Sequence, residues 1–243
     1  YGMSNQFSVF NKELAGAVVP GSGSSSMSTY NTESWMARAM YNYDKRYFAQ
    51  GSIMRQASSR FHKDNWWGTF YSFSAGWLMN NEHWFNVDWV DELKFKASYG
   101  ENGNDQIGSY RYVNYYSIVN SNDAVSLIPE SYGNPEISWE KNAKFNVGFD
   151  FSLFNGRFGG SVEYYENNTY DMLSWVPFPA SFGWSGTYAN IGDMKNSGIE
   201  VDLHGDVISS KNFTWSLYAN MTTNTNEITM LAPERRSMKL DGH

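Results

Sequence analysis

The sequence predicts an all-β protein, a transmembrane antiparallel β-barrel to which this chain contributes about eight strands. First, segments alternate between apolar and polar residues, as where Phe213, Trp215 and Leu217 interleave with Thr214 and Ser216. That period of two is typical of a strand with one apolar face. Second, aromatic residues make up 18% of the 243 residues and charged residues only 18%, with a mean hydropathy of −0.55. Third, the chain lacks an apolar run of about 18 residues, which a membrane helix needs. A wall that is apolar on one side and polar on the other suits a barrel in lipid around a water-filled lumen.

Each alternating segment predicts one strand. The segments cover residues 34–43, 46–57, 69–80, 92–100, 139–151, 157–169, 195–206 and 212–224. Asp44 and Lys45 form a short polar turn after the first strand, and Asn155–Gly156 is a hairpin signal after the fifth. Part of the connection before the fifth strand, 110–119, has the character of a strand that extends beyond the membrane.

The connections alternate in length. Those after the first, third, fifth and seventh strands are short, whereas the others are mostly long, above all 102–138 and 170–192. Outer-membrane barrels place short turns at the periplasmic side and long loops outside. We therefore expect 34–231 to be part of a barrel with those two long extracellular loops, 1–33 to be an extracellular loop segment, and 232–243 to begin a further loop.

Composition and motifs exclude several classes of function. The net charge of −7 argues against nucleic-acid binding, which needs a basic face. The absence of cysteine excludes disulfide scaffolds, thiolate metal sites and cysteine nucleophiles. The sequence carries no Ser/His/Asp spacing, phosphate-binding glycine loop or HExxH motif. We therefore expect no catalytic residue, no cofactor and no enzyme activity.

Acidic residues and one histidine recur at every second position of the seventh strand. These are Glu200, Asp202, His204 and Asp206. Carboxylates with a histidine could bind a metal, but residues two apart on one strand form a compact site only with ligands from neighbouring strands. Alternation alone places all four on the lumen-facing side, so we predict a polar lumenal row and no metal site.

The long loops carry aromatic residues where an external ligand would arrive. They are Trp66, Trp67, Tyr110, Tyr112, Tyr115, Tyr116, Phe182 and Trp184. Flat rings bury the apolar faces of sugars or peptides while polar ring atoms keep hydrogen bonds, so we predict substrate or partner contact. The alternative is an interfacial girdle or packing between loops; a girdle would account for Trp66, Trp67 and Trp139, which lie near strand ends.

Five ordered segments resemble the SusC/RagA-type TonB-dependent outer-membrane transporters of Bacteroidetes. They span 58–77 (SSRFHKDNWWGTFYSFSAGW), 93–104, 134–173, 190–203 and 213–229. The resemblance covers residues 35–231 and implies a barrel of about 22 strands in the outer membrane. No plug domain or TonB box occurs in this sequence, and Tyr1–Phe10 does not resemble a signal peptide. We therefore expect an internal fragment from the C-terminal half of such a barrel.

The resemblance also implies a function and partners. The implied activity is import of oligosaccharides or peptides, with a SusD-like surface lipoprotein over the external mouth. TonB would act through a plug domain, and outer-membrane lipid and lipopolysaccharide would surround the wall. An alternative is a SusC-like barrel that serves as a structural scaffold in an envelope assembly complex. The sequence leaves both open, since the coupling elements are not in this chain.

Overall fold

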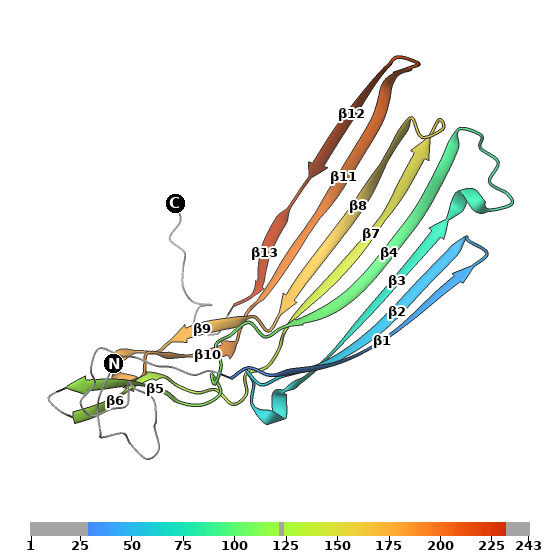
Figure 1. Cartoon of the computed structure of the whole chain (residues 1–243). Helices are drawn as coiled ribbons and strands as arrows, with labels where there is room; N and C mark the ends of the chain where they lie inside the picture. Colours follow the sequence, from blue (N-terminus) through green and yellow to red (C-terminus); the bar gives the residue numbers. More distant parts are fainter. Residues whose placement is uncertain (1–28, 122–123, 232–243) are drawn as a thin grey trace.

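The computed structural model of the chain describes residues 29–121 and 124–231. Its main element is an antiparallel sheet of nine strands, arranged as one curved layer (Figure 1). In spatial order the strands are β1 (Thr32–Tyr43), β2 (Tyr47–Ser58), β3 (Trp67–Leu78), β4 (Val90–Asn104), β7 (Glu140–Leu153), β8 (Phe158–Tyr170), β11 (Asp193–Ser210) and β12 (Phe213–Thr222); β13 (Thr225–Met230) also pairs with β11. All eight predicted strands are confirmed, and they pair in the order in which they occur.

Two small sheets lie at the end of the large sheet where the long connections gather (Figure 1). The first pairs β5 (Tyr115–Ser121) with β6 (Ala124–Ser131), and the second pairs β9 (Leu173–Pro177) with β10 (Gly186–Asn190). Three short 3-10 helices complete the described structure: η2 (Lys63–Asn65), η3 (Met79–Asn81) and η4 (Ala180–Phe182). In the described part of the chain, no helix has the length and apolar character that a membrane crossing requires.

Residues 225–230 follow the last predicted strand, and no strand is predicted for them. These residues form β13, which pairs with Asp193–Ser197 of β11 beyond the end of β12. The segment is too polar to show the alternation that marks the other strands, but β11 offers it backbone hydrogen-bonding partners. Most of the predicted loop 1–33 and the predicted loop 232–243 lie outside the described residues.

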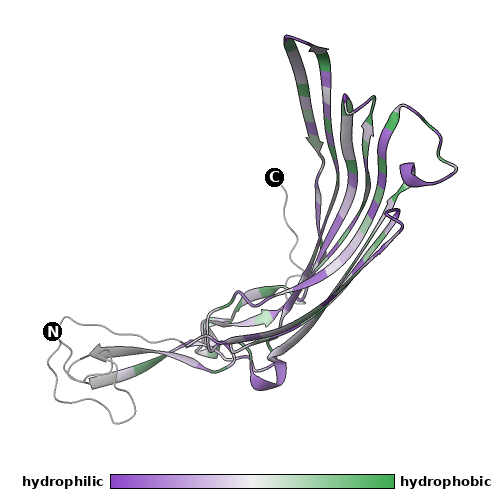
Figure 2. Cartoon of the chain, turned by 45° about the vertical axis from the view of Figure 1, so that its right-hand side comes forward, coloured by the Kyte–Doolittle hydropathy of each residue, from purple (hydrophilic) through white to green (hydrophobic). Residues whose placement is uncertain are grey.

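Strand register sorts the side chains onto two faces. Lys96 of β4 lies opposite Gly148 of β7, which lies opposite Glu163 of β8, and Glu163 lies opposite Glu200 of β11. The neighbouring row joins Trp77, Phe95 and Phe149 on the other face. Alternating colours along the strands in Figure 2 follow this pattern of polar and apolar positions. The sheet is therefore a wall with one polar and one apolar face.

The apolar face is largely uncovered. Trp35 is 68% exposed, Phe73 59% and Leu217 50%. An uncovered apolar surface of this extent is a liability in water, whereas lipid is its natural solvent. At the long-loop end this band gives way to charged residues, namely Glu101, and Glu166 paired with Lys195 at 2.8 Å. The band therefore has a polar upper border.

The buried core lies at the long-loop end, where Phe70 of β3 meets residues of the loops. Phe61, Phe70, Ile107, Ile137 and Trp139 form it, with Phe61 and Phe70 rings 5.2 Å and 5.6 Å from Trp139. Trp139 is only 4% exposed, so its placement in an interfacial girdle is wrong. The loop residues Phe61, Ile107 and Ile137 belong to the same buried cluster. The indole N–H of Trp139 donates to the carbonyl oxygen of Trp66 at 3.0 Å.

Candidate functional site

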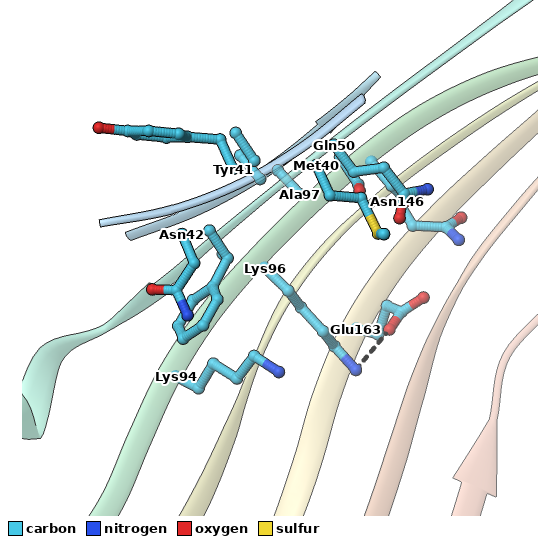
Figure 3. A pocket seen from close by; sticks show the side chains of 15 residues that line it. Met40, Tyr41, Asn42, Gln50, Lys94, Lys96, Ala97, Asn146 and Glu163 are labelled. Atoms are coloured by element: carbon cyan, nitrogen blue, oxygen red, sulfur yellow. Dashed lines mark ion pairs between the residues drawn. The ribbon is translucent and has the colours of Figure 1, made fainter. Parts of the chain in front are cut away.

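A hollow of about 600 Å³ lies on the polar face of the sheet (Figure 3). Its amide, serine and charged side chains come from β1, β2, β3, β4, β7 and β8. They are Asn42, Gln50, Ser74, Lys94, Lys96, Ser98, Asn146 and Glu163. In Figure 3, Lys96 and Glu163 point toward each other, whereas Tyr41 points away from them. Apolar side chains such as Met40 and Phe48 complete the lining, so the hollow offers both polar and apolar contacts.

Three residues of this wall form a charged group that we call the lumenal cluster: Lys96, Asp150 and Glu163. The Lys96 ammonium lies 2.9 Å from one carboxylate oxygen of each acidic residue. All three side chains are roughly one quarter to one third exposed, at 35%, 32% and 23%. Solvent at that exposure screens the attraction, so the cluster contributes little to stability. Its consequence is to hold three charged side chains of three strands at defined places on the polar face.

The predicted lumenal row lies on the same polar face, on β11. Asp202 faces Ser161 of β8, while His204 stacks on Tyr218 of β12 with ring centroids 6.3 Å apart. Asp206 accepts a hydrogen bond of 2.6 Å from the Ser216 hydroxyl. The residues described in the structure contain no group of three or more histidine or acidic side chains placed to hold a metal. The polar face thus carries Lys94 and Lys96 on β4, and the acidic side chains with one histidine on β11.

Sequence reasoning did not single out the lumenal cluster. Lys94 and Lys96 alternate with apolar neighbours and so could be placed on the polar face from the sequence. Their meeting with Asp150 and Glu163 depends on β4 and β7 lying side by side, although a connection of 35 residues, 105–139, separates them. A prediction of which strands are neighbours in the sheet, rather than the local pattern of residues, would have been needed to find this cluster.

Part of the predicted aromatic set comes together in what we call the loop aromatic patch. It consists of Tyr116, Tyr132, Phe178, Phe182 and Trp184, of which Tyr132 and Phe178 were not predicted. The Trp184 ring lies 5.2 Å from Tyr116 and 5.8 Å from Tyr132. Phe178 lies 6.3 Å from Tyr132 and 5.4 Å from Phe182, which is 66% exposed. The patch therefore joins the two long connections and leaves rings accessible.

The other predicted aromatic residues lie apart from this patch. Trp66 donates its indole N–H to the carbonyl oxygen of Phe61 at 2.8 Å, and the guanidinium of Arg55 lies 4.9 Å from the Trp67 ring. Tyr112 packs against the buried core. The remaining two, Tyr110 and Tyr115, are exposed near Arg111, whose guanidinium lies 5.6 Å from the Tyr115 ring.

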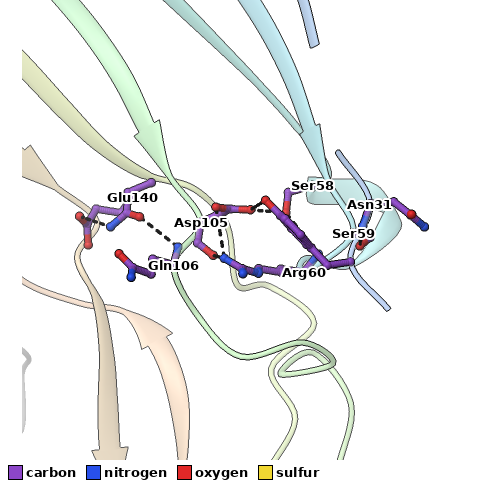
Figure 4. A network of polar contacts seen from close by, with 9 residues as sticks. Asn31, Ser58, Ser59, Arg60, Asp105, Gln106 and Glu140 are labelled. Carbon is purple, nitrogen blue, oxygen red and sulfur yellow. Dashed lines mark hydrogen bonds and ion pairs between the residues drawn. The ribbon is translucent and has the colours of Figure 1, made fainter. Parts of the chain in front are cut away.

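A polar network ties the loop bases to the wall (Figure 4). Asp105 accepts hydrogen bonds from the Tyr30 hydroxyl at 2.8 Å and the Ser58 hydroxyl at 2.5 Å. Arg60 donates to the Asp105 backbone carbonyl at 2.9 Å and stacks 4.1 Å from the Tyr30 ring centroid. Burial, together with the hydrogen bond to Asp105, raises the pKa of Tyr30. Charged and polar groups here hold residues that lie 75 positions apart.

The two long connections are also bonded directly to each other. The Tyr132 amide donates to the carbonyl of Gly186 at 2.8 Å, and the Thr187 hydroxyl donates to the carbonyl of Tyr132 at 2.7 Å. Asn190 donates its side-chain amide to the carbonyl of Ser138 at 2.9 Å. These bonds make β5, β6, β9 and β10 one connected platform beyond the wall.

A curved antiparallel wall with an uncovered apolar band on one face, polar side chains and a hollow on the other, and long loops at one end is typical of outer-membrane β-barrel proteins. The particular family follows from comparison. A family described as TonB dependent receptor-like, beta-barrel, matches residues 1–237. The chain belongs to this family of TonB-dependent receptors, and the predicted fold, localisation and family are confirmed. Membership of a receptor family also supports the expectation that the chain is not an enzyme.

Two curated relatives show where in the family the chain lies. It is 36% identical over 208 residues to TonB-dependent receptor P39 of Formosa agariphila, which covers 85% of this chain and 20% of that protein. It is 34% identical over 209 residues to TonB-dependent receptor SusC of Bacteroides thetaiotaomicron, covering 82% of this chain and 21% of SusC. The chain thus spans about a fifth of the length of these relatives.

Solved structures agree. The structure of the RagAB peptide transporter matches with a TM-score of 0.78 and 35% identity over 83% of this chain and 22% of that one. The siderophore receptor PirA of Pseudomonas aeruginosa matches with a TM-score of 0.55 at 11% identity, over 82% of this chain and 35% of PirA, which shows the fold alone.

Proposed function

We propose that this chain is part of the barrel of an outer-membrane importer that takes up oligosaccharides or peptides with energy supplied through TonB. The observation that carries the proposal is the hydrated polar face, with its lumenal cluster, in a wall of SusC- and RagA-like sequence. The wall performs no covalent chemistry. Its contribution is a polar path through lipid, with loops that bind partners at its mouth.

The wall works only as part of a larger cylinder. Among the described residues, β1 and β12 each have a strand neighbour on one side only. Unpaired backbone groups in lipid cost several kcal/mol each, so the outer edges require further strands. We infer a closed barrel of about 22 strands, as in other large outer-membrane transporters, around a plug domain through which TonB acts.

The platform of β5, β6, β9 and β10 is the proposed contact for a SusD-like surface lipoprotein. Its support is the loop aromatic patch, since accessible aromatic rings are enriched where proteins bind each other or bind sugars. Rings such as Phe182 and Trp184 supply the apolar contact. The predicted extracellular loops 102–138 and 170–192 contain the whole platform. The polar border of Glu101, Glu166 and Lys195 lies at the proposed level of lipopolysaccharide.

Deletion of one hairpin in the full-length protein tests this function. Replacing residues 115–131, which form β5 and β6, by a short glycine-serine linker should weaken co-purification of the lipoprotein and reduce uptake of labelled peptide or oligosaccharide. A matched variant that carries Leu127→Ala alone, at an exposed position of β6, should keep both. Unchanged co-purification would contradict the partner contact, and normal uptake in a strain without the barrel would favour the scaffold alternative.

A further inference from the structure

The connection between β3 and β4 has features that the proposed transport function does not use. This segment, residues 79–89, which we call the rim connector, lies at the short-turn end of the wall (Figure 1). It carries three aromatic residues, Trp84, Phe85 and Trp89. Trp84 is 62% exposed and Trp89 is 52% exposed. Among the described residues, the one aromatic ring that stacks with Trp84 is that of the neighbouring Phe85, with ring centroids 6.0 Å apart.

A buried carboxylate holds the start of the rim connector against the apolar face. The Glu82 side chain is only 7% exposed and accepts three hydrogen bonds. The donors are the Tyr47 hydroxyl at 2.5 Å, the Arg46 guanidinium at 2.9 Å and the Trp77 indole N–H at 3.0 Å. Hydrogen bonds from Tyr47 and Trp77, and then from Arg46, lower the pKa of Glu82. The Glu82 carboxylate is thus charged but buried, whereas the indoles of Trp84 and Trp89 are exposed.

The other end of the rim connector is held by the turn between β7 and β8. The Phe154 amide donates to the carbonyl of Trp89 at 2.9 Å, and the two rings stack with centroids 5.6 Å apart. Phe154 has a φ of 58°, a left-handed conformation that is unfavourable for a bulky residue and that its surroundings must enforce. The Gly156 amide donates to the Asp91 carboxylate at 2.9 Å. The strained turn therefore presents a ring beside Trp89.

These aromatic residues continue a row on the apolar face. Rings follow one another at 5.7–6.5 Å across six strands, and we call this row the aromatic ladder: Tyr41, Tyr43, Tyr47, Trp77, Phe95, Phe149, Phe151 and Phe158. Glu82 is bonded to two of its members, so the rim connector begins directly at the ladder. Tyr and Trp prefer the boundary between hydrocarbon and headgroups because one end of each ring is apolar and the other polar.

We propose that the rim connector anchors the wall in the phospholipid interface of the periplasmic leaflet, with Trp84 inserted and Glu82 as the positioning residue. Lipid fits better than a protein partner because the exposed rings adjoin the membrane-facing band. The Trp84 indole N–H also lacks a partner in the described structure, and a headgroup phosphate or carbonyl oxygen would supply one. Burial of the Glu82 carboxylate keeps its charge away from the interface next to Trp84, whereas the exposed Asp88 lies at the other end of the connector, beside Trp89.

The test uses the full-length protein in vesicles of phosphatidylethanolamine and phosphatidylglycerol, so it is independent of uptake. A nitroxide label is attached at Trp84→Cys, in a background without other cysteines; this segment itself has none. Lys63→Cys, an exposed position in η2 at the opposite end, is the matched control. We expect the label at position 84 to collide with oxygen readily and with an aqueous nickel chelate several-fold less often than the label at position 63.

Variants of Glu82 test the positioning role. Glu82→Ala should raise the nickel collision rate at position 84, while Glu82→Gln, which keeps a hydrogen-bond acceptor, should raise it less. Heat-modifiable gel mobility verifies that each barrel is folded. Equal nickel access at positions 84 and 63 overturns the proposal, and so does shielding of position 84 from both reagents, which indicates a protein contact. If the label results are as expected but the full-length protein does not take up substrate, only the proposed transport function is contradicted.

Discussion

At Gly103 the backbone of β4 lies so close to the buried core that a side chain has no room. A Cβ atom there would lie 2.1 Å from the Phe70 ring and 2.7 Å from the Trp139 ring. Both rings are nearly fully buried, at 2% and 4% exposure, so neither can move aside. A single missing side chain therefore lets the loop core settle against the end of the wall.

Gly103→Ala should destabilise the loop end by about 1–3 kcal/mol, the usual cost of overpacking. We expect faster proteolysis of the two long connections in the full-length protein in detergent, and a lower unfolding midpoint in urea. Gly51→Ala is the matched control, because a Cβ there would meet the Phe73 ring at an ordinary 3.6 Å. Equal behaviour of the two variants would show that the core tolerates the added methyl group.

The stabilisation of the rim connector by the hydrogen bonds to Glu82 should depend on pH. Its folded pKa lies below the ordinary value of 4.5, so the stabilisation is present above 4.5 and is lost as pH falls through the folded pKa. The charged group that faces it is Arg46, which also pairs with Asp44, and its neutral donors are the Tyr47 hydroxyl and the Trp77 indole N–H. A label at position 84 should therefore gain mobility only below about pH 4.5. In Glu82→Gln the same titration should be flat; a matching transition there would assign it to another group.

At the scale of the element, each strand is defined by which face its residues occupy. Val201 lies on the apolar face of β11 in register with Val162 and Met221, while the adjacent Asp202 lies on the polar face. A slip of one residue would exchange the two faces along the whole strand. The free-energy cost of moving charged side chains into lipid therefore determines the register more strongly than any single contact does.

Val201→Arg should destabilise the inserted barrel by about 2–4 kcal/mol, the cost of a basic residue near the middle of the lipid face. Asp202→Arg places the same side chain one residue away, on the hydrated face, and should cost far less. Urea unfolding of the full-length protein in lipid vesicles measures both. Similar losses for the two variants would mean that the assignment of faces is wrong.

For the whole molecule, the most important property is that the described wall is a single sheet and that no second layer covers its apolar face. Its apolar face and its outer edges are open, and its buried core lies only beneath the loops. The 243-residue chain on its own should therefore sediment as aggregates without detergent and become dispersed with it. A compact, monodisperse monomer in plain buffer would contradict the placement of the apolar face in lipid.

How much of the fold and of the candidate site could be predicted from the sequence depends on how far apart in the sequence the interacting residues lie. The hairpin between β7 and β8 was predicted because Asn155–Gly156 is a local turn signal, and the faces of β12 were predicted because alternation is local. β13 was missed because only its pairing with β11 makes it a strand. For Trp139 the girdle alternative was wrong, because its burial by Phe61 and Phe70 depends on residues that lie far from it in the sequence.

The sequence by itself determined the eight long strands and their two faces, because a period of two and short turns act between near neighbours, and its ordered segments identified the family. Only the tertiary structure decided which groups meet across the wall. Lys96 reaches Asp150 and Glu163, Glu82 reaches Tyr47 and Trp77, and the two long connections join in one platform. The physical reason is that strand order and loop closure bring together residues that no local pattern connects.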